Sequence, residues 1–282
     1  MAKLRRNKQR DPEPVRSRGR RAPIIELNDV TKVYPGGHMA LDRVSLSIGR
    51  GEFVFLVGPT GCGKSTLIKT LIRELDVTDG SVRIAGRDIG EMADKKIPQL
   101  RRNIGTVFQD FKLLPNRTVY DNVAYALQVI GASRAEIREQ VPATLRLVGL
   151  STKLHNFPDQ LSGGEQQRVA VARAFVNHPP LMLADEPSGN LDPVTSIGIM
   201  QLLYRINKTG TTVVVVTHDR EMVDNMRRRV VELYEGRVVR DEVSGGYTEE
   251  STTEFGMRMQ AEIGVGADGE RKTNGHGHSL AR

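Results

Sequence analysis

Short apolar runs recur along this chain of 282 residues and are separated by segments with helical spacing. Phe53–Val57 is a continuous apolar run, which is typical of a strand buried on both faces of a helix-covered parallel sheet. Further strands are predicted at Ile24–Leu27, Val44–Ile48, Ser81–Ala85, Ile104–Phe108, Leu181–Ala184 and Thr212–Thr217. Helical spacing over Lys64–Leu75 and Pro193–Asn207 completes an α/β alternation.

Residues 109–162 break this alternation. Asp121–Ile130 and Arg134–Val148 show helical spacing, and no strong strand pattern lies between them. We therefore expect a helical insertion in the α/β core over about residues 109–162. The whole folded domain is expected to span residues 24–240.

Polar tails flank the expected domain. Residues 1–23 carry nine Lys or Arg against two acidic residues, which predicts a disordered basic tail. Residues 241–282 carry four Lys or Arg against eight Asp or Glu and predict a largely flexible C-terminal extension. The net charge of +7 therefore comes mostly from one tail, and nucleic acid is not an expected partner of the core.

Three classes of protein are disfavoured by composition. No apolar run approaches the ~20 residues that cross a bilayer. No apolar segment follows the basic N-terminus, as a secretion signal requires. Cys62 is the single cysteine, which excludes an intrachain disulfide and fits a reducing compartment. We expect a soluble chain in the cytoplasm.

A phosphate loop follows the buried strand and precedes a predicted helix, as such loops require. Its residues, with the first helical positions, are Gly58, Pro59, Thr60, Gly61, Cys62, Gly63, Lys64, Ser65 and Thr66. The glycines let backbone N–H groups converge on the β- and γ-phosphates, and the helix N-terminus adds a favourable dipole. Lys64 would neutralise the phosphates and Ser65 would ligate Mg²⁺.

Two carboxylates end the predicted strand Leu181–Ala184. Asp185 at this place can reach Mg²⁺ directly or through water, and Glu186 can polarise an attacking water. The plainer alternative is a pair of acidic residues that begins a loop. The phosphate loop upstream favours the catalytic interpretation.

A second glycine-rich turn, Ser162-Gly163-Gly164, opens a helix between these two motifs. With Glu165 it also fits a capping box, so a capped helix N-terminus is one interpretation. The other is a second phosphate-binding helix end. Such an end cannot reach the first site within one domain.

The order of these three motifs resembles the ABC-type ATPases over roughly residues 24–240. The resemblance implies a P-loop NTPase (RecA-like) α/β core with an antiparallel β subdomain and an inserted α-helical subdomain. It implies ATP and Mg²⁺ as cofactors. It also implies a homodimer in the ATP-bound state, in which each Ser162-Gly163-Gly164 turn closes over the nucleotide of the other copy.

Further roles follow from the resemblance alone. Gln109 matches the Q-loop, His218 the switch histidine at the γ-phosphate, Tyr34 the aromatic that stacks on adenine, and Asp192 the D-loop position. The implied catalytic residues are Lys64, Gln109, Glu186 and His218, and the implied metal ligands are Ser65, Gln109 and Asp185.

The stretch Phe108–Val123, with Tyr34–Gly37 and Gly189–Pro193, resembles the FtsE family of cell-division ATPases more specifically. That family works with the integral membrane protein FtsX at the cytoplasmic face of the cell membrane and is thought to drive peptidoglycan remodelling. The resemblance implies that a coupling helix of the partner is received at Phe111, Leu113 and Leu114. In the plainer interpretation these three are core residues of the insertion.

Three alternatives stay open. The energy subunit of a lipoprotein-releasing or export ABC transporter shares much of the pattern. A soluble ABC protein acting on DNA or the ribosome would use the basic tail, although the core shows no concentrated basic patch and no zinc cysteines. A P-loop kinase is disfavoured by the Ser162-Gly163-Gly164 turn.

Overall fold

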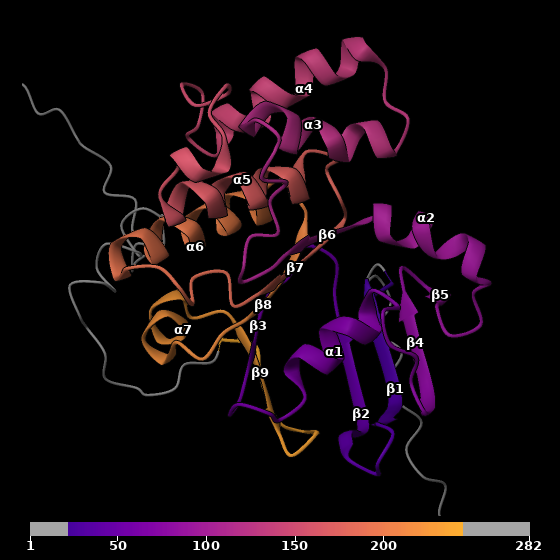
Figure 1. Ribbon diagram of the computed structural model, residues 1–282. Helices are drawn as coiled ribbons and strands as arrows, with labels where there is room; N and C mark the ends of the chain where they lie inside the picture. The colour runs from indigo at the N-terminus through magenta and orange to yellow at the C-terminus, as the bar shows by residue number, and fades with distance from the viewer. Residues whose placement is uncertain (1–21, 245–282) are drawn as a thin grey trace, which may run out of the picture.

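A six-stranded mixed sheet forms the centre of the computed structural model, which describes residues 22–244 (Figure 1). Its strands, in spatial order, are β10 (Arg237–Glu242), β9 (Arg229–Tyr234), β3 (Phe53–Val57), β8 (Thr212–Val216), β7 (Leu181–Asp185) and β6 (Ile104–Val107). All neighbours are parallel except β10, which is antiparallel to β9. The predicted tails fall mostly outside the described residues, and the last described strand ends at Glu242.

A second, four-stranded antiparallel sheet lies beside the first, at the lower right of Figure 1. Its spatial order is β2 (Met39–Ile48), β1 (Ile25–Val33), β4 (Asp79–Ile84) and β5 (Arg87–Asp88). β1 and β2 are joined by a short turn, and β1 also pairs with β4. This is the expected antiparallel subdomain.

Seven α-helices in residues 22–244 cover these sheets. They are α1 (Lys64–Leu71), α2 (Ile97–Arg102), α3 (Val119–Val129), α4 (Arg134–Leu147), α5 (Gly163–Phe175), α6 (Pro193–Lys208) and α7 (Arg220–Met226), with 3₁₀ turns η1 (Asp94–Lys96) and η2 (Pro158–Gln160). In Figure 1, α3 and α4 stack on α5 and α6 above the central sheet, and α1 lies near the antiparallel sheet. The architecture confirms the α/β fold class expected for an ABC ATPase.

Strand β3 is buried on both faces, as its continuous apolar run predicted. Phe53 and Phe55 pack in the core formed with the helices α3 to α7, whereas Val54 and Leu56 pack in the core shared with α1 and the antiparallel sheet. Two hydrophobic cores therefore meet at one strand. The loop that leaves the end of β3 is consequently anchored from both sides.

Helix α1 ends earlier than the sequence predicted, at Leu71 rather than Leu75. Arg73 adopts a left-handed conformation (φ 55°), which stops the helix. The guanidinium of Arg101 donates to the carbonyls of Ile72 and Arg73 at 3.0 Å each. This cap comes from a residue 28 or more positions away, so the local pattern could not show it.

The segment between β6 and α3 is held by one buried amide. The side chain of Asn122 accepts from Leu114 N–H at 2.8 Å and donates to the carbonyls of Leu114, Arg117 and Thr118 at 3.0 to 3.1 Å. Thr118 caps α3 by accepting from Asp121 N–H. These bonds fix the entry of the chain into the helical insertion.

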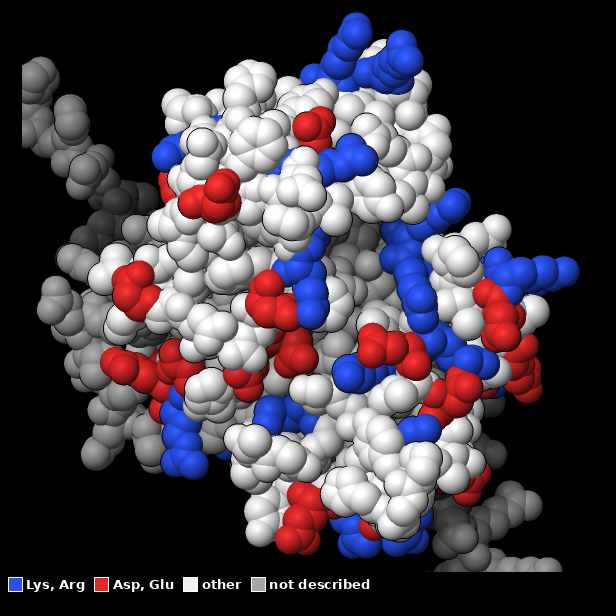
Figure 2. Space-filling view, in the orientation of Figure 1, with Lys and Arg blue, Asp and Glu red and all other residues white. Residues whose placement is uncertain are grey.

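Charged side chains of both signs lie on the face shown in Figure 2. Within residues 22–244, no helix is long and apolar enough to cross a membrane.

Candidate active site

Three glycines of the phosphate loop, Gly58, Gly61 and Gly63, have a positive φ, and at two of them there is also no room for a Cβ atom. Gly58 (φ 138°) and Gly63 (φ 108°) have backbone conformations that L side chains rarely adopt. A Cβ atom on Gly58 would collide with the carbonyl of Leu233, and one on Gly63 with the carbonyl of Ala40. The loop therefore follows a path along which main-chain atoms of neighbouring strands approach very closely.

The side chain of Lys64 is turned back into its own loop. Its ammonium donates to the carbonyls of Gly58 and Pro59 at 2.8 Å each and lies 3.8 Å from the Cys62 sulfur. Lys64 is only 7% exposed. Because a buried cation must be compensated, these acceptors hold it in the place where the loop would receive phosphate.

Asp185 ends β7, and its carboxyl lies close enough to the Ser65 side chain for that hydroxyl to act on its pKa. Burial, and then the neighbouring charge of Glu186, raise the pKa of the Asp185 carboxyl above its ordinary value, while Ser65 and Lys64 oppose the rise. A carboxylate that is short of compensating charge at a hydroxyl-lined site suits a hard divalent cation. The structure thus brings together two of the three predicted metal ligands.

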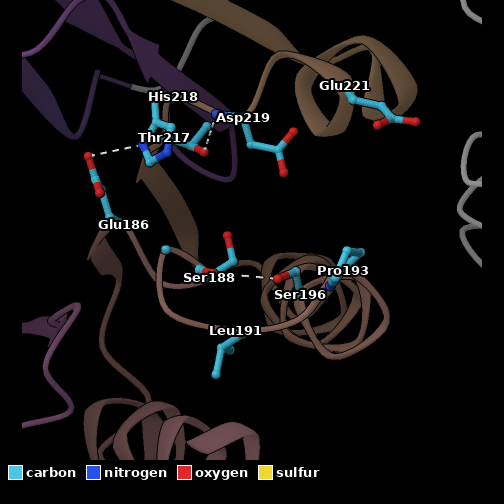
Figure 3. Close-up of a pocket in the computed structure, with 10 residues that line it drawn as sticks. Glu186, Ser188, Leu191, Pro193, Ser196, Thr217, His218, Asp219 and Glu221 are labelled. Carbon is cyan, nitrogen blue, oxygen red and sulfur yellow. Dashed lines mark hydrogen bonds and ion pairs between the residues drawn. The ribbon is translucent and has the colours of Figure 1, made fainter.

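Glu186 stands on the wall of a cavity of about 300 Å³ (Figure 3). Its backbone is left-handed (φ 46°), which is uncommon for a residue other than glycine. Its N–H donates to the Val216 carbonyl at 3.0 Å, and its Oε1 lies 3.3 Å from Nδ1 of His218. Figure 3 shows the two side chains facing each other from the ends of neighbouring strands β7 and β8.

Gln109 lies on the other side of the loop that follows Glu186. Its amide donates to the Asn190 side chain at 3.4 Å. A Cβ atom on Gly189 would lie 3.2 Å from Nε2 of Gln109 and 3.3 Å from Oε2 of Glu186. Gly189 is thus the narrow spacer between two predicted catalytic side chains. Among the described residues, no hydrogen bond joins Gln109 to Ser65 or Asp185.

The turn at Ser162 forms the complete capping box that the sequence suggested. Ser162 Oγ accepts from Glu165 N–H at 3.3 Å, and Glu165 accepts from Ser162 N–H at 2.9 Å. The bond from Ser162 N–H, and more weakly Lys153, holds the pKa of Glu165 below its usual range. In residues 22–244 the N–H groups of Gly163 and Gly164 have no acceptor, as is normal for a helix start.

The same turn rests on the start of α6 in its own protomer. A Cβ atom on Gly164 would collide with the methyl group of Thr195. Asp192 caps α6 by accepting from Thr195 N–H at 3.0 Å. The Thr195 hydroxyl, and after it this backbone bond, lower the pKa of Asp192. No hydrogen bond or ion pair in the described chain joins Ser162, Gly163 or Gly164 to the phosphate loop.

Tyr34 lies in the turn between β1 and β2, beside the phosphate loop. Its hydroxyl is 3.2 Å from the hydroxyl of Thr66 in α1. Its ring lies parallel to that of His38, with 6.4 Å between the centroids. An aromatic face is thereby held next to the first turn of α1, although its proposed stacking on adenine stays a prediction.

Two polar residues of α5 that the sequence analysis passed over reach the site loops. Gln167 is fully buried and donates to the carbonyl of Pro187 at 2.6 Å. Arg173 donates to the carbonyls of Phe111 and Lys112 at 2.9 and 2.7 Å. A signal existed for Gln167, because it falls at helical spacing on the apolar face of α5.

The residues present fit Mg²⁺ and a nucleoside triphosphate. The loop leaves open space for a phosphate group next to Gly61, since nothing lies within 4 Å of a Cβ atom built on that residue. Lys64 supplies a cation that now rests on backbone carbonyls. Ser65 and Asp185 supply the hydroxyl and carboxylate oxygens that Mg²⁺ prefers.

Comparison with known proteins agrees with this geometry. The model of the ABC transporter family matches residues 41–189, which include the phosphate loop, the Ser162 turn and the acidic strand end. A protein named cell division ATP-binding protein FtsE from Mycobacterium tuberculosis is 55% identical over 225 residues, covering 79% of this chain and 98% of that protein. The protein of the same name from Escherichia coli is 46% identical over 215 residues, covering 76% and 97%.

A solved structure shows the same architecture. The dimeric structure of a post-hydrolysis state of an ATP-binding cassette bound to ADP and Pi is 40% identical, with a TM-score of 0.71, and covers 79% of this chain and 100% of that one. The family match itself ends at residue 189, before Asp192 and His218. This chain belongs to the ABC transporter family of ATPases and, within it, to the FtsE group of cell-division ATP-binding proteins.

Proposed function

We propose that this chain is the ATP-binding and ATP-hydrolysing subunit of an FtsEX-like complex in cell division. In this proposal it transmits ATP-driven dimer closure to an integral membrane protein of the FtsX kind that controls peptidoglycan remodelling. It is peripheral, on the cytoplasmic side of the cell membrane. The observation that carries the proposal is the grouping of Ser65, Asp185, Glu186 and His218 at one site, in a chain that is 46 to 55% identical to proteins named cell division ATP-binding protein.

Binding of the triphosphate falls to the phosphate loop. Lys64 would exchange the carbonyls of Gly58 and Pro59 for phosphate oxygens, and the exchange keeps the buried cation paired. Ser65 and Asp185 would hold Mg²⁺, which when bound neutralises charge on the phosphates. The residues of the loop thus orient the nucleotide before any bond is broken.

Activation of water falls to Glu186. In an ionised state its carboxylate accepts a proton from the water that attacks the γ-phosphate. His218, 3.3 Å from Oε1, fixes the rotamer of that carboxylate from one side. Gln109 borders it from the other side across Gly189. A proton acceptor held in one place supplies orientation, which is a large part of phosphoryl-transfer catalysis.

Completion of the site falls to a second copy. The Gly163 and Gly164 N–H groups have no acceptor in the described chain and make no contact with their own phosphate loop. An anion-binding helix end of this kind suits the phosphates of a nucleotide held by another protomer. A solved relative with a post-hydrolysis nucleotide is titled as dimeric, which supports this arrangement.

The proposed contact with the membrane partner lies on the helical insertion. Phe111, Leu113 and Leu114 are half-buried in the segment between β6 and α3. Tyr125 and Val129, one turn apart on α3, are 44% and 50% exposed. Large apolar side chains exposed on one helix face suit burial against a partner.

The test is capture of partners by a variant that cannot complete hydrolysis. Glu186→Gln should keep ATP binding, lose nearly all turnover and accumulate as a nucleotide-bound dimer. Tagged Glu186→Gln protein would be captured with Mg-ATP from detergent-solubilised native membranes and the bound proteins identified by mass spectrometry. Glu221→Gln, which changes another carboxylate of the same cavity wall, is the control for turnover.

A four-span membrane protein with a large extracytoplasmic loop, beside wall-remodelling factors, would support the proposal. A many-span permease or a lipoprotein carrier would move the function to transport. Rapid turnover by Glu186→Gln would remove Glu186 from the role of proton acceptor. Capture of no membrane protein would favour the alternative of a soluble ABC protein.

A further inference from the structure

Gln167 makes one strong contact and leaves one atom without a partner. Its buried amide N–H donates to the Pro187 carbonyl at 2.6 Å. Among residues 22–244, its amide oxygen has no hydrogen-bond partner. The opposite orientation of the amide would place two acceptors against each other, so the NH₂ group faces Pro187.

An apolar side chain would suit this position better for stability alone. The neighbours of Gln167 on the buried face of α5 are Val171 and Ala170, and a buried acceptor without a partner is unfavourable. A polar side chain kept at a position that favours an apolar one indicates a functional constraint that outweighs the loss of stability. The bond to Pro187, which directly follows Glu186, indicates what that constraint is.

Arg173 makes an equivalent contact two turns further along α5. Its guanidinium donates to the carbonyls of Phe111 and Lys112, both of which have left-handed backbones (φ 58° and 48°). No ion pair of Arg173 with a carboxylate is found in residues 22–244. The half-buried Arg173 cation is therefore compensated by the main chain that follows Gln109.

The opposite end of α5 is the Ser162 turn. One rigid helix thus carries, at its N-terminus, the group that faces a partner's nucleotide and, along its length, two side chains that hold the loops of its own active site. Gly164 also rests on Thr195 at the start of α6. A small shift of α5 would move these contacts together, since packed helices move as units.

We infer that Gln167 and Arg173 are positioning residues through which α5 sets the places of Glu186 and Gln109. Docking of the Ser162 turn on a partner's nucleotide fixes α5, and α5 then fixes Glu186 through Pro187 and Gln109 through the Phe111–Lys112 main chain. Each protomer becomes competent for hydrolysis when its own helix end is engaged. This inference rests on the proposed ATP hydrolysis and dimerisation, and adds the route between the two sites.

The test removes the amide of Gln167 while keeping its length. In Gln167→Met, Mg-ATP affinity should stay within about twofold of the wild-type value, whereas kcat falls by about tenfold at unchanged KM, because a displaced Glu186 affects only the transition state. The Hill coefficient for ATP should fall toward 1 as the route between sites is cut. Fluorescent-nucleotide titration and steady-state ATPase assays of the full chain measure all of these.

Asn177→Leu is the matched control. Asn177 follows the same helix and donates one amide bond to the Arg102 carbonyl at 2.9 Å, which lies on no site loop. The Asn177→Leu substitution removes the same kind of hydrogen bond and should leave kcat and the Hill coefficient unchanged. Equal losses of kcat in Gln167→Met and Asn177→Leu, tracking equal losses of thermal midpoint, would show a merely structural bond. Wild-type kcat and Hill coefficient in Gln167→Met would overturn the inference.

Arg173→Lys provides a second measurement if Gln167→Met does not fold. Lysine keeps the charge, but its side chain is shorter and lacks the planar pair of N–H groups with which Arg173 reaches the two carbonyls. We expect the Mg²⁺ concentration for half-maximal turnover to rise several-fold, with Mg-free ATP affinity unchanged. An unaltered Mg²⁺ dependence would overturn the role of Arg173. Failure of the wild-type chain to hydrolyse ATP would instead refute the proposed function, so the two failures are distinguishable.

Discussion

The two glycine-rich turns that open α1 and α5 are built in opposite ways. At α1 the N-cap is Gly63, in a left-handed conformation and without any side-chain cap. At α5 the N-cap is Ser162, in an extended conformation and inside a full capping box. Both precede a helix whose first N–H groups suit an anion.

The difference shows which turn depends on its ligand. The α1 turn contains a buried ammonium that rests on the loop's own carbonyls. The α5 turn keeps its shape without a ligand, because Ser162 and Glu165 cap each other, and only the N–H groups of Gly163 and Gly164 are left for an anion. The first turn must therefore rearrange its bonds when phosphate arrives. The second turn needs no such rearrangement.

Lys64→Met should break the α1 turn and leave the α5 turn intact. The loss of charge-assisted bonds to phosphate is expected to lower Mg-ATP affinity by about a hundredfold. Titration with a fluorescent ATP analogue measures this. Lys69→Met, on the exposed side of the same helix, where Lys69 pairs with Glu74, should bind as the wild type does. Unchanged affinity in Lys64→Met would mean that the ammonium does not leave its carbonyls.

Gly164→Ala should disturb the α5 turn and leave the α1 turn intact. The added methyl group collides with Thr195 and displaces the α5 turn. ATP affinity of the monomer should be preserved, while turnover and the ATP-driven dimer seen by light scattering fall by about tenfold. Gly198→Ala is the control, since its methyl group meets only the flexible end of Arg168. A normal dimer in Gly164→Ala would separate this turn from dimerisation.

Asp185→Asn should have the smallest effect of the three substitutions, and this effect is a change in how the stability of the folded state depends on pH. The pKa of Asp185 is raised on folding, so its carboxyl favours the folded state below the ordinary value of 3.8, and this contribution is lost as pH rises through the folded pKa. The nucleotide-free variant should therefore gain stability over the wild type as pH rises from 4 to 7. Mg-ATP should reverse the order, because only the wild type keeps the carboxylate ligand.

Thermal unfolding across this range, with and without Mg-ATP, measures both parts. A stability difference that does not change with pH would contradict the assigned cause of the shift. Such a result would mean that Ser65 and Lys64 compensate Asp185 fully in the nucleotide-free protein.

Much of the fold follows from local patterns. The continuous apolar run of β3 and the motifs at Ser65, Glu186 and Ser162 predicted the sheet core and the order of elements. The helices of the insertion began within two residues of their predicted starts. Periodicity and glycine spacing are properties of short stretches, so one sequence displays them.

Other features depend on contacts between distant residues. The end of α1 is set by Arg101, and the resting place of Lys64 by the closed form of its loop. The bonds of Gln167 and Arg173 span 20 and about 60 positions. Whether a polar residue on a helix is buried, and which carbonyl it meets, is fixed only by tertiary packing.

The hairpin of β9 and β10 supports the phosphate loop but is synthesised much later than the loop. The carbonyl of Leu233 lies against Gly58, and Gly236 N–H donates to the Cys62 carbonyl at 3.1 Å. These partners are separated by about 175 positions of chain. During synthesis, which proceeds from the N-terminus, the loop emerges long before the hairpin that braces it. The nucleotide site is consequently among the last parts of the domain to be finished on the ribosome.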